Sequence, residues 1–259
     1  MITSLAGHVK LQQAPLKRVI CQLRFPTILG FSASTMRPFQ QAIEDSYPLI
    51  HVEKVIVGVA IMGADVNPTQ VDIKDVFRFA VADGDTTVAV SEDFISLETT
   101  NYDRFTHFSE RWEGLMTSAL ATLGVRHQAR LGLRYTNIIE RDTAADTIDT
   151  WTGVIQEHLL RPIQAISAPI GATAFAEQHV VRANTEHGGI VFRHGFPTPP
   201  EEQLPIGYML DIDNYDDKPK TIAIPQHLVQ LAQWDHQSYA LLRASVSDAQ
   251  WASFGPEGS

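Results

Sequence analysis

The sequence predicts an α+β protein in which antiparallel sheets and packed helices form two sheet-and-helix halves. Short runs that alternate apolar and polar residues outnumber the helical repeats along the chain. Turn dipeptides such as Asp83-Gly84 join neighbouring runs in the way that hairpins require. The regular strand-helix-strand alternation of a parallel sheet is weak. A polar stretch near residue 145 predicts a boundary between the halves, which are residues 1–145 and 146–259.

The first half contains several strand patterns and two helices. The strands are expected over residues 17–25, 51–62, 76–82, 86–91, 94–99 and 127–140. Ser34 or Thr35 is expected to cap the first helix, and Thr100 or Asn101 the second. The apolar stripe of the second helix is Phe105, Phe108, Trp112, Leu115 and Leu123, with Gly124 at its end. We expect this stripe to be buried against a sheet that includes Leu131 and Leu133.

The second half is expected to begin with a short helix over residues 151–160 that Pro162 stops. Strand patterns follow over residues 175–183, 189–194 and 206–213. A long helix is expected over residues 225–243.

Composition narrows the class of protein. The 259 residues include 30 acidic and 20 basic side chains, a net charge of −10, which argues against general nucleic-acid binding. The single cysteine, Cys21, excludes an intramolecular disulfide and a thiolate metal cluster. No leader pattern is present, and no run approaches the roughly 18 apolar residues that span a bilayer. These features lead us to expect a cytoplasmic protein with no membrane association.

The most informative segment is the strand pattern over residues 130–140. Alternation places Arg130 and Arg134 on one face with Gly132, and Tyr135 and Asn137 on the other. Two cations in mid-strand either line a groove for an anion or partner, or form the solvated side of the sheet beside acidic neighbours such as Glu98 or Glu140. Gly132 leaves the strand surface between them open. Arg130, Arg134, Tyr135 and Asn137 are therefore the candidate ligand- or partner-binding residues.

The sequence assigns no catalytic residue and no cofactor. Asp211 and Asp213 share a strand face and are the candidates for a divalent metal, but aspartates at a strand end often cap a turn, which we take as their role. The ten histidines show no zinc-binding spacing. His236 follows Asp235, which suits either acid-base chemistry or a plain helix surface. Phosphate-loop and nucleophile-elbow motifs are missing.

Several segments resemble a sporadically distributed prokaryotic family of uncharacterised proteins of similar length. They are residues 18–25, 91–102 and 130–137, then Leu210-Asp211-Ile212-Asp213, Trp234-Asp235-His236 and residues 245–248. The likeness covers nearly the whole chain in order and implies an architecture without a reaction. Its patchy distribution implies mobile or defence-type loci. The chain departs from the family after Pro15-Leu16, where an acidic residue is more usual, and this weakens the case for a carboxylate acting there.

Two functions remain open at this point. The preferred one is a binding or assembly module, such as an accessory subunit of a mobile or defence-type locus, whose partner is another protein or a second copy of the chain. The alternative is a metal-dependent hydrolase or nucleotide-processing enzyme. In that enzyme Asp211 and Asp213 would hold the metal while Arg130 and Arg134 clamp a phosphate.

Overall fold

A single large antiparallel sheet organises the molecule, in agreement with the predicted α+β class. The computed structural model describes residues 9–57, 72–141, 151–170, 177–197 and 207–257. Within these ranges nine strands form the sheet in the order β2-β3-β4-β5-β1-β7-β10-β9-β8. Their bounds are β1 Leu16–Arg24, β2 Leu49–Val57, β3 Asp72–Ala80, β4 Thr86–Ser91, β5 Phe94–Thr99, β7 Arg130–Glu140, β8 Glu177–Thr185, β9 Gly188–Phe196 and β10 Gly207–Asp216. A separate ladder joins β6 (His127–Gln128) to β11 (Lys220–Thr221).

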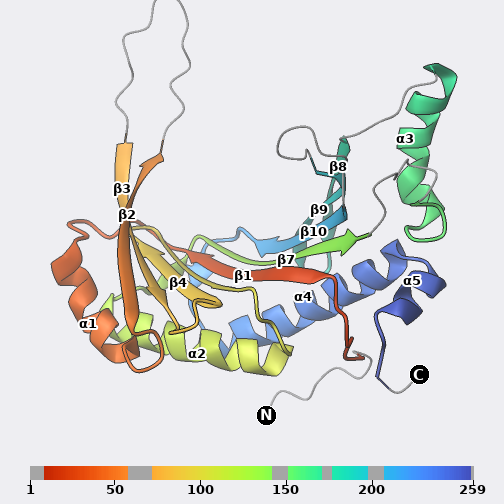
Figure 1. The fold of residues 1–259 in the computed structure, drawn as a ribbon. Coiled ribbons are helices and arrows are strands. Elements are labelled where there is room, and N and C mark those ends of the chain that lie inside the picture. The colour runs from red at the N-terminus through yellow and green to blue at the C-terminus, as the bar shows by residue number, and fades with distance from the viewer. Residues whose placement is uncertain (1–8, 58–71, 142–150, 171–176, 198–206, 258–259) are drawn as a thin grey trace, which may run out of the picture.

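Three helices cover one face of the sheet, and Figure 1 shows no helix over β1 and β7 on the opposite face. The covering helices are α1 (Ala33–Ile43), α2 (Phe105–Thr122) and α4 (Ile224–Ser245). Helix α2 contacts both α1 and α4. The uncovered side of the sheet is called the open face below, because it is the side on which polar residues of the central strands meet solvent.

The order of elements occurs twice along the chain. Each set consists of a strand, a helix, several hairpin strands and a second helix. The first set runs from β1 to α2 and the second from β7 to α4, with α3 (Glu157–Ile170) in the place of α1. In each set the first strand pairs with the last, β1 with β5 and β7 with β10. Strands β1 and β7 meet antiparallel at the centre. The second set starts before residue 145 and both share one sheet, so a domain boundary at that residue stays a prediction.

The apolar stripe of α2 is buried as predicted. Phe108, Trp112, Leu115 and Leu123 are buried in one cluster with Leu131 and Leu133 of β7, and Phe105 packs at its margin. A second cluster joins Trp151 and Leu160 to Phe192 and Phe196 of β9 and Tyr208 of β10. The first cluster extends from the strands of the first set to β7, and the second lies against β9 and β10. Both form because the apolar positions of the strands alternate toward the helices.

Some element boundaries differ from the sequence prediction. Helix α3 begins at Glu157 and continues through Pro162 and Pro169, whereas Pro162 was expected to stop it. Proline has a helical φ and removes one hydrogen bond, so a helix that is otherwise supported can continue through it. Helix α2 is capped at Arg104 and α1 at Ser32, neither of them the residue expected. The strand expected over residues 51–62 is described as far as Val57, and the rest lies outside the described residues.

Among the described residues, no helix combines the length and the apolar character that a bilayer crossing requires.

Candidate functional site

Strand β7 divides the four candidate residues between two surfaces. It pairs with β1 on one side and β10 on the other, so its side chains lie near the middle of the sheet. Arg130 and Arg134 point to the open face, while Tyr135 and Asn137 are buried on the helix-covered side. The sequence placed these residues on opposite sides of the strand, and the structure agrees.

Arg134 is fixed by a buried carboxylate. Its Nε and Nη2 atoms donate to the two oxygens of Asp211 at 2.6 and 2.9 Å, and Arg193 Nη1 from β9 donates to Asp211 Oδ2 at 3.0 Å. The Asp211 side chain is fully buried, whereas that of Arg134 is 39% exposed. Donation of hydrogen bonds to Asp211 raises the pKa of Arg134 above its ordinary value. One carboxylate of β10 therefore holds two guanidinium groups at the open face, from β7 and β9 on either side of it.

Arg130 is held by a second carboxylate of β10, that of Asp213. Its Nη2 atom donates to Asp213 Oδ2 at 3.1 Å, and its guanidinium lies 5.0 Å from the ring centroid of Tyr215. A Cβ added to Gly132 would stand 2.8 Å from Arg130 Nη1. The space above Gly132 is thus filled by the arginine itself, and the expectation of an open strand surface there is wrong. Burial raises the pKa of Asp213, and the nearby arginines oppose that effect.

The acidic partners differ from those suggested by the sequence. Glu98 pairs with Arg18 at 3.5 Å and Glu140 with Lys17 at 2.9 Å, while the two β7 arginines bind Asp211 and Asp213. The turn-capping role expected for those aspartates is wrong, because their carboxylates accept hydrogen bonds from the arginines of β7 and β9. The turn contact is made by Asp216, whose Oδ1 accepts from the backbone N–H of Lys218 at 3.1 Å.

The open face carries an excess of positive charge, although the chain as a whole is acidic. Across the six neighbouring strands β5, β1, β7, β10, β9 and β8, strand register places six arginines on this face, namely Arg18, Arg24, Arg130, Arg134, Arg182 and Arg193. Three carboxylates lie among them, namely Glu98, Asp211 and Asp213. Lys17 and Glu140 neutralise each other at its end. This surface, called the arginine-rich face from here on, thus has three more positive than negative charges.

Two of these arginines face each other across a strand pair. Arg24 of β1 is the register partner of Arg130 of β7. Like charges directly opposite one another destabilise a strand pair. Among the described residues, the Arg24 side chain forms no ion pair. An anion bound between Arg24 and Arg130 would relieve this repulsion.

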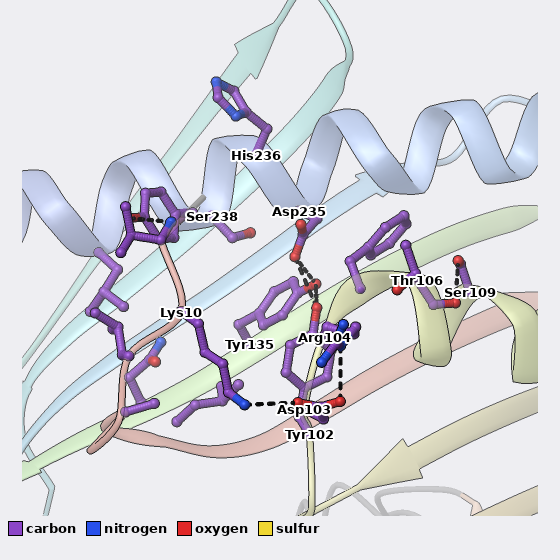
Figure 2. Close-up of a pocket in the computed structure, with 18 of the residues that line it drawn as sticks. Lys10, Tyr102, Asp103, Arg104, Thr106, Ser109, Tyr135, Asp235, His236 and Ser238 are labelled. Carbon is purple, nitrogen blue, oxygen red and sulfur yellow. Dashed lines mark hydrogen bonds and ion pairs between the residues drawn. The ribbon is translucent and has the colours of Figure 1, made fainter. Parts of the chain in front are cut away.

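Tyr135 and Asn137 line a pocket on the helix-covered side. The pocket has a volume of about 700 Å³ and is bounded by α2, α4, β7 and the segment before β1. Figure 2 shows the hydroxyls of Tyr102 and Tyr135 pointing toward Asp235 of α4. They lie 3.1 and 2.6 Å from Asp235 Oδ1. Asp235 and Tyr102 were not singled out as site residues from the sequence, although Asp235 stands within the Trp234-Asp235-His236 segment that carried the resemblance.

The histidines take structural positions. His236 is exposed, and in Figure 2 its ring points away from Asp235. His227 and His194 are buried, and burial lowers the pKa of each to about 4. His194 stacks on His179 and its Nδ1 lies 2.7 Å from the Tyr208 hydroxyl. Among the described residues, no three His, Cys, Asp or Glu side chains gather as a metal site.

Comparison with known proteins adds no family. No family model matches the chain, and no curated protein matches it either.

Proposed function

We propose that the protein is a binding module whose arginine-rich face docks an acidic segment of a protein partner. The observation that carries this proposal is the excess of three positive charges on the arginine-rich face, across strands β5, β1, β7, β10, β9 and β8, of a chain whose net charge is −10. A local field of this kind steers and orients an oppositely charged surface. It also accounts for the arginines of mid-strand positions, where apolar or uncharged polar residues would serve the sheet equally well.

The spacing of the arginines suits an extended acidic peptide. The Cα atoms of Arg130 and Arg134 are about 13 Å apart along β7, as for any residues four positions apart in an extended strand, and the Arg130 side chain lies over Gly132 between them. Their side chains remain 29% and 39% exposed despite their pairs with Asp213 and Asp211. Guanidinium groups have donors on several edges, so an arginine held by one carboxylate still has N–H groups for a second.

The same contacts weigh against a metal-dependent hydrolase. The carboxylate oxygens of Asp211 accept hydrogen bonds from Arg134 and Arg193, and those of Asp213 accept from Arg130. A divalent cation would have to displace these guanidinium groups before it met the carboxylates. We therefore favour binding over catalysis.

Fluorescence anisotropy with a labelled glutamate-rich peptide tests the proposal. We expect saturable binding that weakens as salt increases, and no binding of the glutamine analogue of the same length. Single-stranded DNA is the competing polyanion. A peptide that fails to bind, or DNA that binds as tightly as the peptide, would overturn the assignment of an acidic protein partner.

A further inference from the structure

The pocket on the helix-covered side is separate from the arginine-rich face. Strand β7 lies between them and presents alternate residues to each. A pocket of about 700 Å³ is large enough for a small organic molecule, because sites for such ligands are commonly about 300–1,000 Å³.

The inner wall of the pocket carries a buried carboxylate held by two phenols. Asp235 is 8% exposed, and its Oδ1 accepts hydrogen bonds from Tyr135 at 2.6 Å and Tyr102 at 3.1 Å. Burial raises the pKa of both phenols well above its usual range, and the negative charge of Asp235 raises it further. Both tyrosines therefore stay protonated and act as donors. Donation from two hydroxyls stabilises the negative charge of the carboxylate.

Aromatic rings surround this carboxylate. The rings of Tyr102 and Tyr135 meet edge to face with centroids 5.8 Å apart, and Phe105 and Tyr239 also line the pocket. Aromatic faces attract organic cations, and the attraction is stronger where water is excluded. A carboxylate among aromatic rings is thus complementary to a positively charged group on an apolar body.

The cationic side chains of the lining are engaged at the rim. Lys10 and Arg104 lie 3.5 and 3.0 Å from the carboxylate of Asp103, and the three side chains are between 39% and 58% exposed. Figure 2 draws both ion pairs at the opposite side of the view from His236. The described part of the lining has three carboxylates, including Asp235 and Glu257, against Lys10 and Arg104, with His236 beside them. More carboxylates than permanent cations among these residues favour a cationic ligand.

We propose that this pocket binds a small organic amine, with the ammonium group at Asp235 and the apolar body against the rings of Tyr102 and Tyr135. The pocket is too large to be filled by a bare metal ion, and its aromatic lining offers few oxygen ligands of the kind that hard metal ions prefer. The site is independent of the docking of an acidic partner on the other face of the sheet.

Two-dimensional NMR titration of the full chain with benzylamine tests this proposal. Benzyl alcohol and benzoate are neutral and anionic probes of similar shape. We expect saturable shifts with benzylamine that centre on the amides around Tyr102, Tyr135 and Asp235, and no saturable shifts with the other two probes. Failure of benzylamine to bind, or tighter binding of benzoate, would overturn the proposal.

Two variants separate the pocket from non-specific attraction. Asp235→Asn keeps the shape and removes the charge, and we expect it to weaken benzylamine binding by about tenfold or more. Thr106→Trp narrows the pocket from the exposed side of α2 without touching Asp235, and Thr117→Trp on the same helix lies outside the pocket and is its matched control. Binding should be lost in Thr106→Trp and retained in Thr117→Trp. Equal binding by these two tryptophan variants would place the amine elsewhere and refute the site.

Discussion

Arg134 grips Asp211 with two parallel hydrogen bonds, from Nε to Oδ1 at 2.6 Å and from Nη2 to Oδ2 at 2.9 Å. The carboxylate is wholly buried and the guanidinium is partly exposed. The pair therefore ties β7 to β10 inside the sheet and presents an oriented cation outside it. This contact serves both stability and recognition. The buried carboxylate of Asp211 fixes the guanidinium of Arg134, which is the group that a partner would meet.

Removing the charge of Asp211 should destabilise the fold. Asp211→Asn leaves Arg134 and Arg193 side by side without the carboxylate that both bind. Breaking a buried ion pair costs about 3–5 kcal/mol, and the partial exposure of both arginines reduces this to about 2–3 kcal/mol. Urea unfolding measures the loss. Glu98→Gln, at a looser and more exposed pair with Arg18, is the control and should change stability by less than about 1 kcal/mol. Equal effects of the two variants would contradict the role given to Asp211.

Trp112 should be a large contributor to the core. Its side chain is fully buried between α2 and the sheet, so Trp112→Ala should lower the free energy of unfolding by about 3–5 kcal/mol. Among the described residues its Nε1 has no hydrogen-bond partner. Trp112→Phe also removes that unsatisfied donor but deletes less side-chain volume than Trp112→Ala. It should therefore lower the free energy of unfolding clearly less than the alanine variant does. A melting temperature that is unchanged in Trp112→Ala would argue against this packing.

Acid should destabilise the protein through His227. Its Nε2 lies 2.8 Å from Gln128 Oε1, and Nδ1 is buried without a partner among the described residues. Burial lowers the pKa to about 4 in the folded state, below the ordinary value of about 6.5. As pH decreases, His227 of the unfolded chain is protonated before His227 of the folded chain. The free energy of unfolding therefore keeps its full value above pH of about 6.5 and falls as pH decreases toward 4, by up to about 3 kcal/mol. His227→Gln should reduce this dependence in urea unfolding at a series of pH values, because glutamine keeps a donor for Gln128 and does not titrate. Part of the dependence should remain, because burial also lowers the pKa of His194 to about 4. His236→Gln, at an exposed position of the same helix, should leave the dependence as it is, and a His227→Gln profile as steep as that of the unchanged protein would contradict the assignment.

Local periodicity accounts for the parts of the fold that the sequence predicted well. The 3.6-residue stripe of α2 identified Trp112 and Leu115 as core, and alternation along β7 separated Arg134 from Tyr135. Both patterns depend on neighbours in the chain. Alternation also showed that Asp211 and Asp213 share a face.

Long-range register accounts for most of what the sequence did not predict. Asp211 is 77 residues from Arg134, and only the pairing of β10 with β7 brings them together. The contact of Asp235 with Tyr102 and Tyr135 spans three separate elements and has no local signature. The error at Gly132 has another cause: a missing side chain predicts space, and the sequence does not say that Arg130 folds into that space. The prediction that Pro162 ends the helix was wrong because tertiary packing outweighs the loss of one helical hydrogen bond.

The central claim is that the arginine-rich face binds an acidic partner, and neutralising two of its arginines tests it most directly. Arg24→Gln combined with Arg130→Gln removes the facing cations and leaves the Arg134–Asp211 pair intact. Arg37→Gln combined with Arg161→Gln removes the same charge from exposed positions of α1 and α3 and serves as the control. Anisotropy titration with the labelled glutamate-rich peptide should show about tenfold weaker binding for the first variant and nearly unchanged binding for the second. Equal affinity of the two variants, with the fold of both retained, would contradict the claim.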